Sequence, residues 1–535
     1  MNSTRARFFT GDIAILFYIA LAKFLIHALL SQQYGYFIDE FYYIAASKRL
    51  AFGYVDFPPF IAVLTALVRA TLGESLAALR LLPALAGSVA VFVTGLMARQ
   101  LGGRRSAQVL AALCSLTAGV FLSVNSMLSM DSFDQLWWAL AALVLILIFQ
   151  GKDARLWLLF GLIAGIGLTT KMTMLYFGFA VAAGMLLSSQ RRQLRIKWLW
   201  LGGAMALSFL LPYLAWNAAN GWPTLGFWSN YADKVFWGSA LDFLLQQVLI
   251  MNPFTLPVWL VGLYFYFSYA GYPPASPDAG RPASGQGEDA TRLERADYRP
   301  LGWAYVLLLL IFTLQHAKHY FLAPAYPMLF AAGAVFLEAY ARQRRWVWVA
   351  PAAAAMILVS GLLVAPLSLP LLPPAALAGY MRLWNGVNIE SENSETGLLP
   401  QHFADRFGWV ELAAAVEQAY DSLPPEEQAQ ACIFAGSYGQ AGALELHGAG
   451  HLPTIISSHN NYFLWGPQGC SGEVMILAIS GVTTTELSQL FGQFEVAATT
   501  DCTYCMPRND ALPIWVARQP KAPLQALWPS LVNFE

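Results

Sequence analysis

Two adjacent carboxylates, Asp39 and Glu40, lie a short step beyond the first long apolar run of the chain, among tyrosines and phenylalanines. A carboxylate that is partly removed from water can take a proton from an incoming hydroxyl. If the pair lies on a helix, consecutive side chains diverge by about 100°, so one acid can face a reaction while the other faces a partner such as Arg49. A solvated interfacial loop with an N-cap aspartate is the alternative interpretation of the same residues.

A second set of chemically capable side chains is basic. The turn 315–321 holds three potentially basic groups, His316, Lys318 and His319, and Lys171 is a lone cation at an expected helix end. Such donors suit an anionic ligand, for example a phosphate at the edge of a bilayer. A lysine that extends toward the membrane surface is the alternative explanation for Lys171. The two histidines lack an assured third ligand, so we predict no metal site from them.

These residues must be positioned by membrane spans. The chain of 535 residues is 57% hydrophobic and only 12% charged, whereas soluble domains average about 25% charged residues. Runs of about 17–25 apolar residues have the length that crosses a bilayer core. We therefore predict a mainly α, polytopic fold with about eleven spans, near 11–30, 80–98, 107–124, 133–150, 156–170, 173–188, 198–216, 244–268, 301–315, 321–340 and 346–366.

Basic residues orient these spans. Clusters at 5–7, 104–105, 152–155, 191–197 and 342–345 fall on one side if the spans alternate strictly. The positive-inside rule makes that side cytoplasmic. The polar stretch 271–300 is then expected as a mobile cytoplasmic loop, and the extracytoplasmic side receives the first loop, 31–79, and the tail. The net charge of −1 favours no nucleic-acid partner.

The tail has ordinary polarity and predicts a separate domain. We expect a membrane domain over 1–372 and an extracytoplasmic α/β domain over 373–535. Its expected elements are helices at 407–422 and 425–430 and strands at 431–435, 474–479 and 514–518. Four cysteines, Cys432, Cys470, Cys502 and Cys505, allow three disulfide pairings, and a structural disulfide is favoured over a catalytic role for Cys502-x-x-Cys505.

Several motifs together resemble the family 39 glycosyltransferases, which include the protein O-mannosyltransferases and the aminoarabinose transferase of lipid A. They are Asp39-Glu40, Asp56-Phe57-Pro58-Pro59, Lys171 after two threonines, and the segment 318–327. The resemblance covers about two-thirds of the chain, and the tail segments 399–409, 438–443 and 459–467 resemble bacterial members. It implies a GT-C fold in a bacterial inner membrane, with membrane lipids around it and the tail domain in the periplasm.

The resemblance also implies a reaction. A sugar passes from a polyprenyl-phosphate carrier to an acceptor outside, with inversion, which needs a base opposite the leaving phosphate and cations on that phosphate. Asp39 matches the family's base, with Glu40 beside it, and Lys318 matches the residue that holds the carrier phosphate. The further candidates for the phosphate are Lys171, Arg49, His316, His319 and Tyr320, and those for substrate contacts are Tyr42, Tyr43, Asp56, Asp131, His459 and Asn460.

Three features stay open at this point. Asp56 departs from relatives that carry a lysine before the Pro-Pro pair, so its role is not assigned. Some relatives use a divalent metal and others use none, and the residues force no choice between them. The sugar and the acceptor, which is a glycolipid, an envelope glycan or a protein, are not identified.

Two other classes of protein compete with the enzyme. A transporter or flippase would explain many spans, but it predicts internal repeats and discontinuous helices in mid-membrane. A sensor whose membrane part is only an anchor needs one or two spans. In the tail, a place in the domain core is the alternative interpretation of His459 and its aromatic neighbours Tyr462 and Trp465.

The orientation of the chain is testable. A reporter that is active only in the cytoplasm should give no signal when fused to Glu535, because the basic clusters place the tail outside. The same reporter inserted after Gly287, in the expected cytoplasmic loop, is the positive control. A bright fusion at Glu535 would overturn both the orientation and the assignment of the site.

Overall fold

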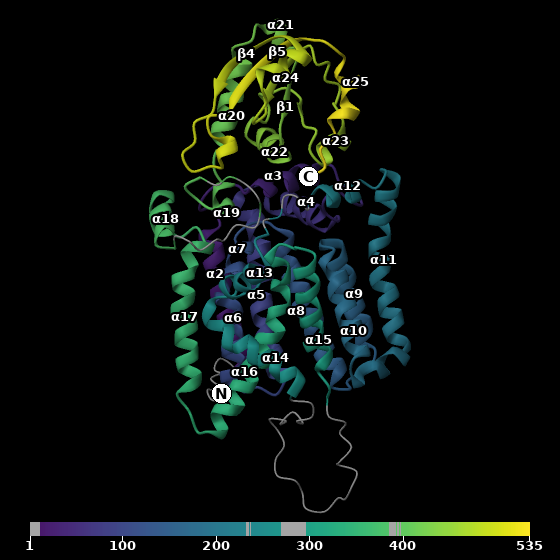
Figure 1. Ribbon diagram of the computed structural model, residues 1–535, viewed down its shortest axis with the longest axis vertical. Coiled ribbons are helices and arrows are strands. Elements are labelled where there is room, and N and C mark those ends of the chain that lie inside the picture. Colours follow the sequence, from purple (N-terminus) through teal and green to yellow (C-terminus); the bar gives the residue numbers. More distant parts are fainter. Residues whose placement is uncertain are drawn as a thin grey trace, which may run out of the picture. The chain divides into compact units, whose positions relative to one another are not determined.

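The computed structural model describes residues 11–231, 235, 237–268, 296–384, 392, 395 and 397–535, and the chain divides into two compact units (Figure 1). Unit 1 comprises Met1–Ser31, Arg80–Pro212 and Trp237–Leu369; unit 2 comprises Gln32–Leu79, Tyr213–Phe236 and Pro370–Glu535. The mainly helical fold with a C-terminal sheet confirms the predicted fold class. The first loop, at 31–79, belongs with the C-terminal segment.

Unit 1 contains the long apolar helices. Its elements are α2 (Asp12–Leu30), α5 (Leu76–Gln100), α6 (Arg105–Thr117), α7 (Gly119–Val124), α8 (Met130–Phe149), α9 (Leu156–Thr170), α10 (Thr173–Leu186), η1 (Ser189–Arg195), α11 (Lys197–Ala219), α13 (Ala240–Ile250), η3 (Pro253–Thr255), α14 (Leu256–Ser268), α15 (Arg299–Leu314), η5 (His319–Ala325), α16 (Tyr326–Gln343) and α17 (Val349–Ser368). Two of them, α5 and α11, run on into unit 2.

The predicted spans recur as helices, but not all are long enough to cross a bilayer. Among the described residues, six helices pass that test by length and composition, or up to eight if each of two bent pairs is one span. The helices at 156–170 and 299–314 are shorter apolar helices. The run 107–124 is interrupted at Ala118, whose backbone is extended. The run 244–268 bends by 95° at its break. The prediction of about eleven spans counted these shorter and broken helices as full spans.

Glycines let the helices α14 and α16 of unit 1 approach until their main chains touch. A Cβ on Gly333 of α16 would lie 1.8 Å from the carbonyl oxygen of Val258 in α14, and one on Gly262 would lie 2.1 Å from that of Leu329. Such a Cβ has no flexible neighbour that can give way, because each oxygen is main chain. Small residues at helix contacts are typical of membrane bundles, where close packing replaces the hydrophobic drive.

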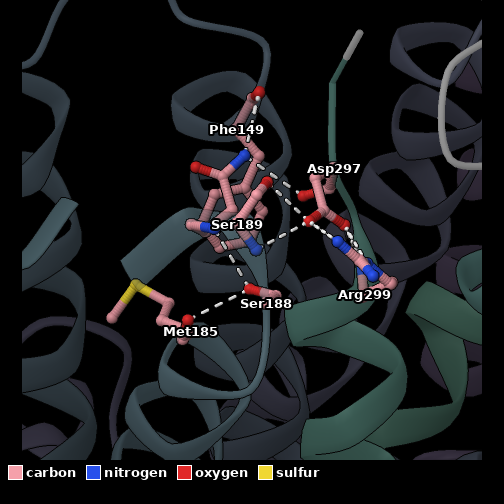
Figure 2. A network of polar contacts seen from close by, with 7 residues as sticks. Phe149, Met185, Ser188, Ser189, Asp297 and Arg299 are labelled. Atoms are coloured by element: carbon pink, nitrogen blue, oxygen red, sulfur yellow. Dashed lines mark hydrogen bonds and ion pairs between the residues drawn. The ribbon is translucent and has the colours of Figure 1, made fainter. Parts of the chain in front are cut away.

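A polar network joins the C-terminal end of α10 to the start of α15 (Figure 2). Asp297 Oδ2 accepts hydrogen bonds from the Ser189 main-chain N–H, at 3.1 Å, and from its hydroxyl, at 2.7 Å. Arg299 donates to both carboxylate oxygens, through Nε at 2.9 Å and Nη2 at 2.7 Å. Burial alone would raise the pKa of Asp297, but the hydrogen bonds from Arg299 and Ser189 outweigh it and lower the pKa to about 2. The expected mobile loop at 271–300 lies outside the described residues up to 295.

We predict that Asp297→Asn destabilises unit 1. Because the folded carboxylate has a pKa below the usual value of about 3.9, its contribution is present above about pH 4 and is lost as the pH falls toward 2. The variant should lower the melting temperature in detergent at pH 7, with a loss of about 1–3 kcal/mol for a charged hydrogen-bonded group. The difference from the parent should shrink at acid pH. Equal melting at pH 7 would contradict this role, and Asp153→Asn, on the exposed α8–α9 connection, is the control.

Unit 2 combines short helices with one sheet. Its elements are α3 (Ile38–Lys48), α4 (Phe60–Leu72), α12 (Pro223–Tyr231), α18 (Pro374–Met381), η6 (Arg382–Trp384), α19 (Gln401–Ala404), α20 (Trp409–Asp421), α21 (Pro425–Gln428), β1 (Ala431–Ala435), α22 (Tyr438–His447), β2 (Ile455–Ile456), α23 (Asn461–Trp465), β3 (Val474–Ala478), α24 (Thr484–Leu490), β4 (Phe491–Thr499), η7 (Pro507–Asn509), β5 (Pro513–Pro520), α25 (Leu524–Leu527) and η8 (Trp528–Leu531).

The sheet has the order β2-β1-β3-β5-β4. β1 pairs in parallel with β2 and β3, and β5 pairs antiparallel with β3 and β4. The predicted strands correspond to β1, β3 and β5, which are short apolar runs because both of their faces are largely covered. β4 was missed because most of its residues are exposed, and glycine, glutamine and glutamate interrupt its apolar residues.

One disulfide joins Cys432 in β1 to Cys470, with the Cα atoms 6.0 Å apart. It selects one of the three pairings that the sequence allowed. Cys502 and Cys505 are buried as free thiols.

Candidate active site

Asp39 and Glu40 lie on the first turn of α3, and the two side chains have different tasks. Glu40 is fully buried, and its Oε2 accepts the main-chain N–H of Phe37 at 2.8 Å, which is the return half of a capping box. Asp39 points instead toward Tyr438, whose hydroxyl donates to Asp39 Oδ1 at 2.8 Å. The helix geometry therefore separates the pair as predicted, although Asp39 is not the N-cap.

The Asp39 contact is part of a cluster of two carboxylates and two tyrosines. Tyr438 and Tyr42 stack with ring centroids 4.5 Å apart and an interplanar angle of 22°. The Tyr42 hydroxyl lies 3.1 Å from Asp56 Oδ1, to which it donates. Each tyrosine therefore has its hydroxyl against one aspartate, so the stacked rings connect the two acids.

The electrostatics of this cluster differ from those of a solvated loop. Burial, and then the negative charge of Asp39, raise the pKa of Asp56 to about 7, against a smaller opposing effect of the Tyr42 hydroxyl. Asp56 therefore binds a proton at a pH where an exposed aspartate is ionised. A carboxyl group whose pKa is raised beside a second carboxylate suits proton transfer.

Asn461 fixes the loop that carries Asp56. Its Oδ1 accepts the main-chain N–H of Val55 at 2.7 Å and lies 3.2 Å from the Tyr42 hydroxyl. In return, the main-chain N–H of Asn461 donates to the Tyr42 oxygen at 3.1 Å. The sequence analysis assigned no role to Tyr438 or Asn461, although both lie in the tail segments that resemble bacterial members.

Other predicted residues of unit 2 already have partners within it. Arg49 pairs with Glu445 at 2.9 Å and lies 4.5 Å from the centroid of the Trp465 ring. With Glu445 it lines a cavity of about 350 Å³ beside the loop 448–455. It belongs to a different unit from Lys171 and Lys318.

Tyr43, His459 and Asn460, predicted to contact substrate, are all buried. The ring of Tyr43 packs edge-on against Phe57, with centroids 5.2 Å apart. His459 Nε2 lies 3.0 Å from the main-chain oxygen of Glu535, and Asn460 Nδ2 donates to the same oxygen at 3.0 Å. Substrate contacts of these three residues stay predictions.

The basic candidates of unit 1 gather around one tyrosine. Lys171 Nζ lies 5.3 Å from the ring centroid of Tyr320 and 4.3 Å from that of Phe321. Lys318 Nζ lies 5.9 Å from the Tyr320 centroid, and Lys318 is only 4% exposed. Asp131, expected to contact substrate, instead pairs with Lys171 at 2.5 Å. The cluster therefore holds two lysines and one carboxylate around an aromatic platform.

The two histidines of the predicted basic turn do not form a metal site. His316 stacks on Trp237 with centroids 4.5 Å apart. The ring of His319 packs edge-on against Tyr320, with centroids 5.9 Å apart, and its main-chain oxygen accepts from Gln247 at 2.9 Å. Within the part of the chain that the structure describes, no group of three or more His, Cys, Asp or Glu side chains suits a metal ion.

Known proteins share this architecture. The chain is similar to the crystal structure of ArnT from Cupriavidus metallidurans in the apo state, with a TM-score of 0.58 and 15% identity over 98% of this chain and 99% of that one. It is similar also to the same protein bound to undecaprenyl phosphate, with a TM-score of 0.59 and 15% identity over 95% and 98%. No curated protein sequence matches the chain significantly.

A family match covers part of the sequence. Residues 56–216 match the family described as dolichyl-phosphate-mannose-protein mannosyltransferase. This segment includes Asp56, Asp131 and Lys171 and begins after Asp39. The resemblance seen in the sequence is confirmed: the chain is a multi-pass membrane protein that matches the protein mannosyltransferase family in residues 56–216 and is similar to ArnT in its fold.

Proposed function

We propose that this protein is a membrane glycosyltransferase that moves a sugar from a polyprenyl-phosphate carrier to an acceptor on the extracytoplasmic side of the inner membrane. Asp39 is the base, and the configuration at the anomeric carbon is inverted. The acceptor is a glycolipid, an envelope glycan or a protein that presents a hydroxyl. The similarity of the fold to ArnT supports this proposal, together with the hydrogen-bonded carboxylate of Asp39 in unit 2 and the two lysines near the Tyr320 ring in unit 1.

The donor class is supported by the structural neighbour. ArnT from Cupriavidus metallidurans was solved with undecaprenyl phosphate. In this chain, Lys318 and Lys171 offer cations beside the Tyr320 ring. A phosphate that accumulates negative charge as the sugar departs needs such donors, which act more strongly where water is excluded. Lys318 and Lys171 are therefore the proposed ligands of the carrier phosphate.

The proton of the acceptor goes to Asp39. As the acceptor oxygen forms its bond to the anomeric carbon, the hydroxyl proton passes to the carboxylate of Asp39, and the bond from that carbon to the phosphate oxygen breaks. The carrier leaves as polyprenyl phosphate. The hydrogen bond that Tyr438 donates to Oδ1 holds this carboxylate in place.

Many transporters have a helix that is broken within the membrane. The bend between α13 and α14 is the break that a transporter would use here. The polar groups at this bend are occupied. Asn252 Nδ2 donates to Thr117 Oγ1 and to the main-chain oxygen of Ile357, both at 3.1 Å. Its Oδ1 accepts from the Ser360 hydroxyl at 2.5 Å. The bend is therefore closed by hydrogen bonds within the bundle, which favours the enzyme.

We predict that Lys318→Met weakens binding of the donor. Methionine keeps most of the volume of this buried side chain but removes its charge, and loss of one charge-assisted contact costs about 1.5–3 kcal/mol. The dissociation constant for undecaprenyl phosphate should rise by about 10- to 150-fold. Binding to the purified variant in detergent measures this directly. Lys152→Met, on the exposed end of α8, should bind as the parent does. If Lys318→Met binds equally well, Lys171 becomes the principal ligand.

We predict that Asp39→Asn abolishes sugar transfer. Asparagine keeps an oxygen that can accept from Tyr438, but it takes no proton, and loss of general-base catalysis typically costs about 10²–10⁴-fold in rate. Expression, thermal stability and donor binding should stay near the parental values. Glu40→Gln should impair transfer less, because an amide oxygen can still accept from the Phe37 N–H.

The control for Asp39→Asn is Asp421→Asn, which removes an exposed carboxylate of unit 2. Transfer of sugar from a polyprenyl-phosphate donor to envelope extracts is followed by mass spectrometry of the product. Near-parental transfer by Asp39→Asn would move the base to Glu40, Asp56 or Asp131. Movement of donor without any glycosyl product, in parent and variant alike, would support a transporter.

A further inference from the structure

Tyr438 reaches Asp39 because two helices far apart in the sequence dock main chain to main chain. β1 ends at Ala435, and the side chain of Ser437 accepts the N–H of Gln440 in a capping box that starts α22. Tyr438 is thus the first residue of α22, at a position that the cap determines. The hydroxyl of this residue lies 2.8 Å from Asp39 Oδ1, across 399 positions of sequence.

Glycines on α22 make this approach possible. A Cβ on Gly439 would lie 2.2 Å from Cγ1 of Ile38, the residue before Asp39. A Cβ on Gly442 would lie 2.8 Å from Cβ of Phe41 and 2.9 Å from its main-chain oxygen. These two glycines are three positions apart, so they lie on the same face of α22. That face therefore fits against the first turn of α3, where the proposed base lies.

The ring of Tyr438 contacts two other rings, those of Tyr42 and His459. It stacks on Tyr42, and its centroid lies 4.8 Å from that of His459. The main-chain N–H of Tyr438 also donates to His459 Nδ1 at 3.3 Å. These contacts restrict the movement of the side chain, so its hydroxyl stays in one place.

We propose that Tyr438 is a positioning residue for the carboxylate of Asp39, so that the base of the transfer site is built jointly by the first loop and the C-terminal segment. The inference rests on the proposed function, because it assigns a support to the base named there. Tyr438 acts through Asp39 and does not itself exchange the proton.

The charges around Asp39 explain why a neutral donor is needed. The neighbouring acids are Asp56 on the loop before α4, Glu40 on the same turn of α3, and Glu392. Besides burial, the charge of Asp39 raises the pKa of Asp56, and the charges of Asp56 and Glu392 raise that of Tyr438. Like charges favour a protonated Asp39, which could not act as a base. A hydrogen bond donated to the ionised carboxylate has the opposite effect. Burial, and then Asp39, raise the pKa of Tyr438 well above its usual value, so its hydroxyl keeps its proton and remains a donor.

The test compares the pH profile of transfer in the parent, Tyr438→Phe and Tyr420→Phe. Phenylalanine keeps the stacked ring and removes only the hydroxyl, and Tyr420 lies on α20 away from the cluster as a matched control. With Tyr438→Phe we expect kcat to fall by at least about 10-fold, but by less than the roughly 10²–10⁴-fold that the general base itself contributes. The acid limb of the profile should move to higher pH, because the ionised form of Asp39 loses a donor. Tyr420→Phe should show neither change.

The outcomes separate the two proposals. An active parent whose kcat and pH profile are unchanged by Tyr438→Phe overturns this inference alone. A variant that melts earlier but keeps both kinetic properties also overturns it, because the contact is then only structural. A parent that forms no glycosylated product overturns the proposed function and this inference with it.

A second pair of variants tests the helix approach. Gly439→Ala forces a Cβ against Ile38 and should lower kcat, because α22 must move away from α3. Ile38→Ala in the same chain opens that space and should restore part of the lost rate. Failure of the double variant to recover any activity, when both variants are folded, would contradict the proposed dependence of Asp39 on this approach.

Discussion

The close contact between α22 and α3 is the constraint on which the candidate site of unit 2 depends. A carboxylate among buried aromatic rings is unfavourable unless it receives hydrogen bonds, because an unsatisfied buried charge loses its hydration. Asp39 receives one from Tyr438. That donor can arrive only if the main chain of α22 lies against α3, which the glycines Gly439 and Gly442 permit. A larger residue at either position would separate the helices before the hydroxyl reached the acid.

The same contact organises the remaining polar groups of the cluster. Once Tyr438 is in place, its ring stacks on that of Tyr42. The Tyr42 hydroxyl in turn lies within hydrogen-bond distance of Asp56 and Asn461. The two aspartates are then near enough for the charge of Asp39 to raise the pKa of Asp56. A carboxyl group with a raised pKa beside a second carboxylate is a common arrangement where protons are transferred. Asp56, which sequence reasoning left without a role, becomes the electrostatic partner of the proposed base.

In unit 1, the positive charge of Lys171 is balanced by the negative charge of Asp131. Lys171 is largely buried and is neutralised by Asp131, with 13% and 21% of the two side chains exposed. A buried cation without a partner would be costly. Lys318 lies beside the ring of Tyr320, as Lys171 does. Under the proposed function, the carrier phosphate binds beside Lys171 and Lys318, and the negative charge it brings adds to that of Asp131.

The sequence by itself determined the features that depend on residues close to one another along the chain. Apolar runs predicted where the helices of unit 1 lie, because lipid and a packed core both require apolar side chains over a whole helix. The buried strands β1, β3 and β5 were visible for the same reason. The Asp39-Glu40 pair and its division of tasks followed from the turn of a helix. The broken helices were predicted less well, since a kink of one or two residues barely changes the mean hydropathy.

Only the tertiary structure decided which partners these residues have. Tyr438 and Asn461 stand hundreds of positions from Asp39 and Val55, and no local pattern marks a tyrosine that will donate to a distant acid. The sequence placed Arg49 with the phosphate ligands, but its ion pair with Glu445 depends on the docking of α22. The pairing of Cys432 with Cys470 likewise required the sheet to form. Local composition determines helices, strands and candidate chemistry, whereas hydrogen bonds and ion pairs between distant segments depend on how the helices pack, which only the folded chain sets.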